Sequence, residues 1–368
     1  PSADGLTLIQ VITDAADGAV SVERTDEWLT LKIDTQKMRR HEKRIRTHIR
    51  GAFAKTFPAL AARAHASYGI VVHRAKGEAI PLADSAPAAF AVVLVHGLDE
   101  PGRLWLGLVP TLLDAQHTVC EFTYPNDQPI AESAALFYES LERLRAKGVL
   151  RVTIVSHSMG GLVSRELLTS PALYDGSGYG HPDLPDVTRL VMIGTPNHGS
   201  PLARFRGFVE MRDQAVRIAR GDAVLLGGIF DGAGEAKVDL LPGSDFILQL
   251  NGRPPPRHTE LTICAGTASP LDLADIERVR ASLRAQLPKK IQPQVRQWCD
   301  GLQQLVTGVG DGAVSLDSAQ IDGVTDTIHL AGNHLTMIRN VLASDPNVPP
   351  AVPHILKRLN EDRAWERD

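Results

Sequence analysis

A serine at the junction of an apolar run and a helical run is the feature that most constrains the fold of this chain. The segment 152–155 is mostly apolar and wholly β-branched, and the residues Ser-His-Ser-Met-Gly at 156–160 follow at once. Such a strand–turn–helix junction exposes the hydroxyl of its central serine, here Ser158, to a neighbouring base. Small residues are needed two positions either side, because strand and helix backbones approach closely. Ser156 replaces the usual glycine at the first of these positions, and we expect the turn to accommodate it.

Apolar runs recur along the chain with helical segments between them. This alternation is typical of a parallel sheet covered by helices on both faces. Ligands of such sheets gather at the carboxyl ends of the strands. The predicted core strands are 91–96, 118–123, 152–156, 189–194, 261–265 and 327–330. The sequence therefore predicts an α/β fold with a mostly parallel, twisted sheet.

Two kinds of addition to this core are expected. Residues 1–85 form an N-terminal extension packed on the core, with an edge strand at 28–33 and an amphipathic helix at 36–66. Residues 86–368 form the core domain, interrupted by two long insertions that follow core strands. Long insertions are usually functional, so we expect a helical cap or lid, the alternative being that they pack beside the sheet. The insertions are at about 202–241 and 271–305.

The composition argues against several classes of function. Of the 368 residues, 43% are hydrophobic and 22% are charged, and the net charge of −4 gives no general attraction to nucleic acid or anionic membranes. The basic stretch 37–44 has no interleaved aromatic residues, which favours a solvated helix face over a nucleic-acid site. No apolar run approaches the roughly 18 residues of a membrane span. We therefore expect a soluble protein that binds no nucleic acid.

Cysteine and histidine spacing predicts neither a disulfide framework nor a metal site. The three cysteines, Cys120, Cys264 and Cys299, are too few for a framework, although one bridge between the last two is left open. No Cys/His cluster has the spacing of zinc ligands, so no metal or other cofactor is expected. No signal segment is visible, which slightly favours a cytoplasmic location, and export is left open as the alternative for a processed chain. The oligomeric state is left open.

A nucleophilic serine needs a base, which chain order places after the last strand. His334 lies on the loop beyond the strand 327–330, where an imidazole reaches over the sheet edge, whereas its rival His329 lies within that strand. The loop position favours His334, because catalytic groups cluster on loops at strand ends. His96 and His157 are expected to have packing or hydrogen-bonding roles instead.

The base in turn needs a carboxylate that orients its ring. Asp311 lies on a tight loop between Gly310 and Gly312, ahead of an apolar run, and is the favoured candidate. Its rivals lie in segments typical of solvated turns or farther from the expected site. They are Asp317, Asp322 and Asp326, with Asp239 and Asp300 as weaker choices.

Backbone N–H groups from two loops are expected to bind the oxyanion that forms during acyl transfer. The strand 91–96 runs into Gly97, which places the N–H of Leu98 beside the nucleophile. Met159 directly follows Ser158, so its N–H is the second expected donor.

Together, these segments resemble the lipases and esterases of the α/β-hydrolase superfamily, and are similar to the bacterial triacylglycerol lipases. They occur in the order of that family and span about residues 90 to 340. The matching segments are 95–98, 156–161, 193–201, 241–246, 310–314 and 332–334. The resemblance implies an α/β-hydrolase fold with helical cap insertions. Ser156 and Asn333 depart from the family pattern, but neither departure removes a catalytic group.

The resemblance also implies a site and a reaction. Ser158, His334 and Asp311 would form the catalytic triad, with Leu98 and Met159 as oxyanion donors. The resulting hypothesis is a serine hydrolase that cleaves esters of small molecules or lipids, with at most transient contact with a lipid surface. A thioesterase, an amidase or an acyltransferase would use the same residues, and a non-catalytic α/β binding module is a further alternative.

Overall fold

In a computed structural model of the chain, the described residues are 20–24, 29–33, 68–74, 78–98, 104–125, 128–200, 235–268, 310–340 and 347–364, with 277, 281, 296 and 300 as single positions. The chain divides into two units. One comprises Pro1–Tyr68 and Phe208–Glu235, and the other Gly69–Gly207 and Ala236–Asp368.

In the first unit, two strands form an antiparallel sheet. These are β1 (Val20–Arg24) and β2 (Leu29–Ile33), with Val22 opposite Leu31. The second strand falls within the edge strand predicted at 28–33. The amphipathic helix predicted at 36–66 lies outside the described residues, as does most of both predicted insertions.

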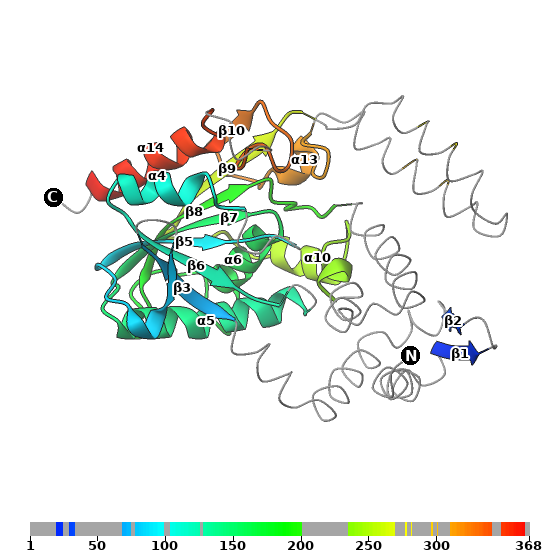
Figure 1. Cartoon of the computed structure of the whole chain (residues 1–368), viewed down its shortest axis with the longest axis horizontal. Helices are drawn as coiled ribbons and strands as arrows, with labels where there is room; N and C mark the ends of the chain where they lie inside the picture. The colour runs from blue at the N-terminus through cyan, green and yellow to red at the C-terminus, as the bar shows by residue number, and fades with distance from the viewer. Residues whose placement is uncertain are drawn as a thin grey trace. The chain divides into compact units, whose positions relative to one another are not determined.

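The second unit is built on an eight-stranded sheet with the order β10-β9-β8-β7-β5-β6-β3-β4 (Figure 1). All neighbouring pairs among β5 to β10 are parallel. These strands confirm the six predicted core strands to within three residues at either end. The strands are β3 (Gly69–His73), β4 (Ala79–Pro81), β5 (Phe90–Val95), β6 (Thr118–Thr123), β7 (Arg151–His157), β8 (Asp186–Ile193), β9 (Glu260–Gly266) and β10 (Thr327–Leu330).

The sheet begins earlier in the chain than the sequence analysis expects. Strands β3 and β4 lie within the expected extension 1–85, yet both belong to the main sheet. Strand β3 pairs antiparallel with β6, and β4 pairs antiparallel with β3. Both are short, and β4 consists of three residues that end at Pro81. A proline has no N–H to donate to a neighbouring strand, so it suits this edge position. Because a proline also argues against a strand, the sequence pattern does not predict β4.

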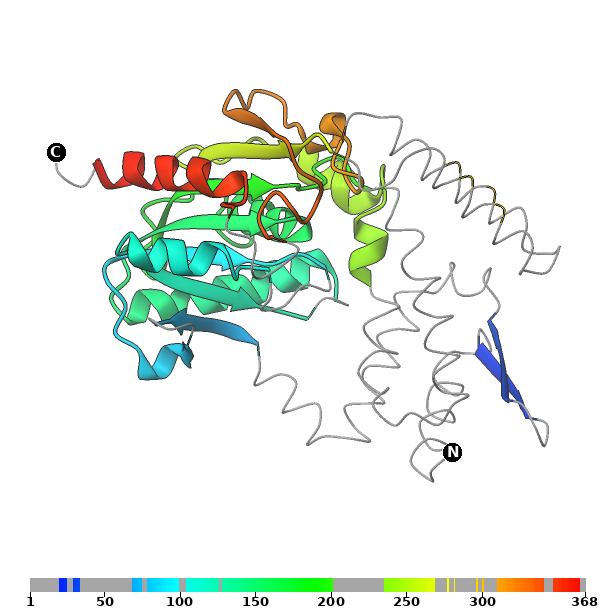
Figure 2. The same cartoon turned by 45° about the horizontal axis from the view of Figure 1, so that its top comes forward.

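Helices cover both faces of the sheet because residues along each strand alternate between the two faces. Val93 and Val95 pack into a core with α5 and α6, whereas Val92 and Leu94 pack into a second core with α4 and α14. Figures 1 and 2 show α4 and α14 side by side on one face. The helices are α4 (Leu108–Asp114), α5 (Ile130–Ala146), α6 (Met159–Thr169), α9 (Glu235–Asp239), α10 (Asp245–Asn251), α13 (Leu316–Ala319) and α14 (Ala351–Ala364), with the 3₁₀ helix η2 (Leu82–Asp84).

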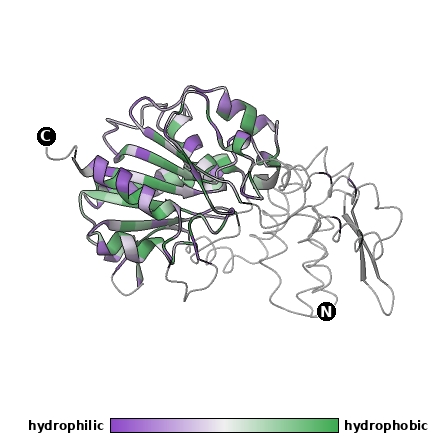
Figure 3. Cartoon of the chain, turned by 90° about the horizontal axis from the view of Figure 1, so that it is seen from above, coloured by the Kyte–Doolittle hydropathy of each residue, from purple (hydrophilic) through white to green (hydrophobic). Residues whose placement is uncertain are grey.

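The burial pattern matches this layering. The strands are mostly hydrophobic, while the helices alternate between hydrophobic and hydrophilic residues (Figure 3). Cys120 in β6 and Cys264 in β9 are buried free thiols, and Cys299, the other end of the bridge left open by the sequence, lies outside the described residues. Burial raises the pKa of each of these two thiols to about 12, which leaves them protonated and unreactive. Within the described part of the chain, no helix is both long and apolar enough to cross a membrane.

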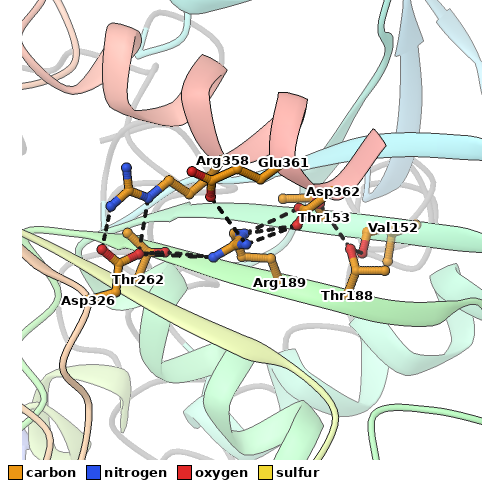
Figure 4. A network of polar contacts seen from close by, with 9 residues as sticks. All are labelled: Val152, Thr153, Thr188, Arg189, Thr262, Asp326, Arg358, Glu361 and Asp362. Carbon is orange, nitrogen blue, oxygen red and sulfur yellow. Dashed lines mark hydrogen bonds and ion pairs between the residues drawn. The ribbon is translucent and has the colours of Figure 1, made fainter. Parts of the chain in front are cut away.

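A polar network fixes α14 to the amino-terminal part of the sheet (Figure 4). Arg189 of β8 donates to the carboxylate of Asp362, with Nη2 to Oδ1 at 3.0 Å, and Thr153 of β7 donates to the same carboxylate at 2.8 Å. Nearby, Arg358 donates from Nε to Asp326 at 3.0 Å. These contacts hold the helix at the end of the sheet opposite to the expected site.

The topology identifies the fold. Six parallel strands, an antiparallel edge, helices on both faces and a serine at the sharp turn after the central strand β7 together make an α/β-hydrolase fold.

Candidate active site

Ser158 lies at a strained turn between β7 and α6. Its φ of +52° and ψ of −126° fall where L-residues rarely lie. Its N–H donates to the carbonyl of Ile193 at the end of β8 (2.9 Å), and its carbonyl accepts from Gly161 (3.0 Å). Backbone strain of this kind persists where the surroundings enforce it, and it clusters at functional sites. The predicted turn with Ser158 at its apex is therefore confirmed.

The residues around this turn are small for steric reasons. A Cβ at Gly160 would lie 2.5 Å from the carbonyl oxygens of Val95 and His96, and one at Gly161 would lie 2.0 Å from Thr195 Oγ1. Ser156 is tolerated because its hydroxyl donates to the carbonyl of Val191 in the neighbouring strand (3.0 Å). The buried hydroxyl that replaces glycine at this position is therefore hydrogen-bonded, and the turn is kept.

The favoured acid and base are in direct contact. His334 Nδ1 lies 2.8 Å from Asp311 Oδ2, so the ring donates to the carboxylate through Nδ1. The backbone N–H of His334 also donates to the carbonyl of Asp311 (3.0 Å). The other carboxylate oxygen, Oδ1, accepts from the N–H groups of Ala313 (2.8 Å) and Val314 (2.7 Å). Asp311 is only 1% exposed, so these donors replace water around its charge.

The electrostatics of this pair keep the acid ionised. Burial raises the pKa of the Asp311 carboxyl, but the charge and hydrogen bond of His334 and the two backbone N–H groups outweigh burial, so the pKa lies below its ordinary value. A carboxylate in this state can fix the tautomer of an imidazole and stabilise its protonated form.

The rival residues lie elsewhere in the fold. Asp326 pairs with Arg358 beneath α14, and Asp239 accepts the N–H of Ile130 at the start of α5 (2.9 Å). Asp317 lies in the first turn of α13. The rival base His329 is exposed within β10. The remaining rivals, Asp300 and Asp322, are both exposed.

The two expected oxyanion donors belong to segments that adjoin Ser158. Met159 is the first residue of α6, where helix geometry leaves the N–H without an acceptor in its own helix. Leu98 follows Gly97, and a Cβ at Gly97 would lie 2.7 Å from the Cβ of Ser158. The loop after β5 therefore approaches the serine closely.

His157 makes a contact that the sequence analysis did not identify. It is fully buried, its Nε2 lies 2.8 Å from the carbonyl oxygen of His334, and the two rings are 4.7 Å apart between centroids. His157 directly precedes Ser158, so this contact links the segment of the base to the elbow. His157 and His334 are 177 positions apart, and no local sequence pattern predicts a contact between them.

The loop after β8 braces the acid. Asn197 is fully buried; its side chain accepts from Arg165 of α6 (3.0 Å) and donates to the carbonyl of Ala319 in α13 (2.7 Å). Ser200 Oγ donates to the carbonyl of Ala313, two residues beyond Asp311 (2.7 Å). These contacts tie this loop to the loop that carries the acid.

The described residues hold no group of three or more His, Cys, Asp or Glu side chains placed to bind a metal ion. The polar groups at this end of the sheet are the carboxylate of Asp311, the imidazoles of His334 and His157, the hydroxyl of Ser158 and backbone N–H groups.

Comparisons with known proteins return solved structures but no family model. The Bacillus licheniformis lipase BlEst2 in its mature form is 19% identical over 75% of this chain and 93% of its own, with a TM-score of 0.48. The phospholipase PlaB from Legionella pneumophila is 16% identical over 73% of this chain and 59% of its own (TM-score 0.46). EstA from Clostridium botulinum is 13% identical over 69% of this chain and 84% of its own (TM-score 0.42).

Proposed function

We propose that this chain is a serine hydrolase that cleaves carboxylic esters of small molecules or lipids, with Ser158 as nucleophile, His334 as base and Asp311 as the residue that orients the base. One observation carries the proposal: the 2.8 Å contact between His334 Nδ1 and the buried Asp311 carboxylate, on a segment tied to the elbow of Ser158. That contact leaves Nε2 as the ring nitrogen for proton transfer.

Acyl transfer proceeds in two halves. His334 Nε2 takes the proton of Ser158 Oγ as this oxygen attacks the acyl carbon. The oxyanion of the tetrahedral intermediate accepts hydrogen bonds from the N–H groups of Leu98 and Met159. The C–O bond to the alcohol then breaks, and the alcohol leaves with the proton held by His334. Water, deprotonated by the same ring, then attacks the acyl carbon. The bond from this carbon to Ser158 Oγ breaks, Oγ takes the proton back from His334, and the acid is released. This chemistry needs no metal or organic cofactor.

Asp311 contributes through its charge. Because its pKa lies below the ordinary value, the carboxylate is ionised at neutral pH and faces His334 each time the ring becomes cationic. Stabilising that cation lowers the barrier to proton transfer from the serine. The carboxylate itself stays unprotonated through the cycle.

The direct test is ester hydrolysis by purified variants. A short-chain p-nitrophenyl ester should be turned over by the wild type, and Ser158→Ala should lower kcat by a factor of about 10⁴ or more. Ser164→Ala is the matched control: Ser164 is buried on the same helix, and its hydroxyl donates to the carbonyl of Gly160 (2.8 Å). The control should keep its activity. Equal turnover by Ser158→Ala and wild type would contradict the proposal.

The substrate class is tested separately. Thioesters, amides and acyl transfer to an alcohol use the same three side chains, so the proposal of an ester substrate predicts a higher kcat/KM for esters than for matched thioesters and amides. A series of acyl chain lengths, run in solution and as emulsions, measures the preference for small-molecule or lipid esters. Faster turnover of the thioester or amide would replace the ester in the proposal and leave the triad unchanged.

A further inference from the structure

We infer that His157 is a positioning residue: by donating a hydrogen bond to the carbonyl of His334, it sets the place of the base relative to the nucleophile. The inference rests on the proposed function and extends it to a residue outside the triad. It is carried by the 2.8 Å contact from His157 Nε2 to the His334 carbonyl oxygen.

His334 is held at three atoms. Its backbone N–H donates to the carbonyl of Asp311 (3.0 Å), its Nδ1 donates to the carboxylate of Asp311 (2.8 Å), and its carbonyl accepts from His157 (2.8 Å). The two contacts with Asp311 fix the ring relative to the acid. The contact with His157 fixes the residue relative to the elbow, because His157 is joined by a peptide bond to Ser158.

The carbonyl of His334 is available for this contact because of the local turn. Asn333 caps the turn: its Oδ1 accepts from the N–H groups of Leu335 and Thr336, both at 3.0 Å. The N–H of Ile338, which would reach the His334 carbonyl in a regular α-helix, donates instead to the carbonyl of Leu335 (3.2 Å). The departure at Asn333 thus shapes the segment that presents the carbonyl to His157.

The ring of His157 has little freedom. It is fully buried and packs against the ring of His334 with 4.7 Å between centroids and 51° between planes. A Cβ at Gly97 would lie 3.4 Å from His157 Nδ1 and 3.2 Å from its carbonyl oxygen. The glycine thus lets the loop after β5 close over this residue. A buried, packed donor of this kind can hold a catalytic group more accurately than a loop alone, and misplacement by about 1 Å costs on the order of 10²-fold in rate.

Three variants separate the hydrogen bond from the packing. His157→Phe keeps an aromatic ring but removes the donor, His157→Gln keeps an amide N–H at a similar reach, and His157→Asn has a shorter amide. We expect Phe to lower kcat by about 10- to 100-fold with little change in KM, and Gln to restore most of the loss. We also expect the acid limb of the pH profile of kcat/KM to move to lower pH in the Phe variant, because a displaced His334 gains less from the Asp311 carboxylate.

The control is His117→Phe. His117 is a buried histidine directly before the amino-terminal end of β6, and it packs near Phe90. This variant tests the effect of replacing a buried histidine by phenylalanine, and it should leave the pH profile and kcat unchanged at a temperature where it is folded. If His157 had only a structural role, His157→Phe would instead have a lower melting temperature and an unchanged pH profile.

The outcomes decide between the two proposals. An active wild type with unchanged kcat and pH profile in folded His157→Phe would overturn the role of His157 and leave the proposed function intact. A wild type that neither turns over esters nor reacts with serine-directed probes would contradict the proposed function itself. Should the Phe variant fail to fold, Gln and Asn make the same comparison, and equal kcat for these two would overturn the inference.

Discussion

At the scale of single residues, the site depends on close approaches that only small side chains allow. The loops after β5 and β8 and the first turn of α6 meet around Ser158, whose positive φ is enforced by that packing. The sequence indicated the need for small residues at the turn. The position of Gly161 against Thr195 is a tertiary contact that the sequence did not announce.

Gly161→Ala should therefore destabilise the fold. Its Cβ would lie 2.0 Å from Oγ1 and 2.6 Å from Cγ2 of Thr195, so the loop after β8 must move. Overpacking of this kind typically costs about 1–3 kcal/mol of unfolding free energy, measurable as a lower urea midpoint. Gly107→Ala is the control, because its Cβ would have an ordinary contact of 3.4 Å with Pro349. Equal midpoints for the two variants would contradict this account of the turn.

Asp311→Asn should lower kcat by about 10⁴ with little change in KM. An asparagine at this position disturbs the tautomer of His334 and removes the charge that stabilises the imidazolium. Asp317→Asn, which changes a rival carboxylate in the first turn of α13, should retain most of the wild-type rate. If Asp317→Asn were the slower enzyme, the acid would have been assigned to the wrong residue.

At the scale of elements, α14 closes one face of the sheet and is held by both apolar and ionic contacts. Val352, Ile355 and Leu359 pack into the core on the side of α4. Asp362 pairs with Arg189, and the two side chains are only 6% and 10% exposed. Arg189 also lies 3.7 Å from Glu361 and 4.0 Å from Asp326, so breaking the pair leaves its charge partly compensated, which still costs more than losing a surface pair.

Asp362→Ala should therefore lower the free energy of unfolding by about 1–3 kcal/mol, because it removes the short hydrogen bonds of the buried Arg189 and leaves its longer contacts with Glu361 (3.7 Å) and Asp326 (4.0 Å). Ester hydrolysis by the folded fraction should be unchanged, since the network lies away from the elbow. The control is Glu139→Ala, which breaks an exposed pair with Arg143 in α5. Urea unfolding measures both, and a loss no larger than that of the control would show that the pair contributes little.

The six parallel strands and the triad candidates were predictable because each has a local signature: an apolar run, a strand–serine–helix junction, or a glycine-flanked aspartate. Strands β3 and β4 were not, because both are short, β3 begins at Gly69 and ends at His73, and the edge strand β4 ends at Pro81. The contact of His157 with His334 was not predictable for another reason. It joins segments brought together only when the sheet forms, and the sequence shows only a histidine beside the serine.

At the scale of the whole molecule, paired carboxylates link stability to pH. Burial raises the pKa of Asp326, but hydrogen bonds from Arg358 and Thr262 and the charges of Arg358 and Arg189 outweigh it, so the pKa is lowered. The pKa of Asp311 is likewise below its ordinary value. Both carboxyls have a lower pKa in the folded state than in the unfolded chain, where the pKa of an aspartate is about 3.9. The stabilisation that they provide is therefore fully present above a pH of about 3.9. It is lost as the pH falls through the lower folded-state values.

The free energy of unfolding should therefore fall as the pH decreases from about 5 towards 2. Urea unfolding at a series of pH values measures this slope. Asp326→Asn should be less stable than the wild type near neutral pH and should show a shallower slope below pH 4, because one of the two linked groups is gone. An equal slope in both proteins would show that Asp326 is not linked to folding in this way.

The central claim is that the Ser158 hydroxyl is an activated nucleophile in the folded chain. The most direct measurement is reaction of the full-length protein with a fluorophosphonate, followed by mass mapping of the modified peptide. We expect one adduct, on Ser158, with no adduct on the Ser158→Ala variant and much slower reaction of His334→Ala. An adduct at another serine, or a well-folded protein that stays unmodified, would contradict it and favour the non-catalytic binding module.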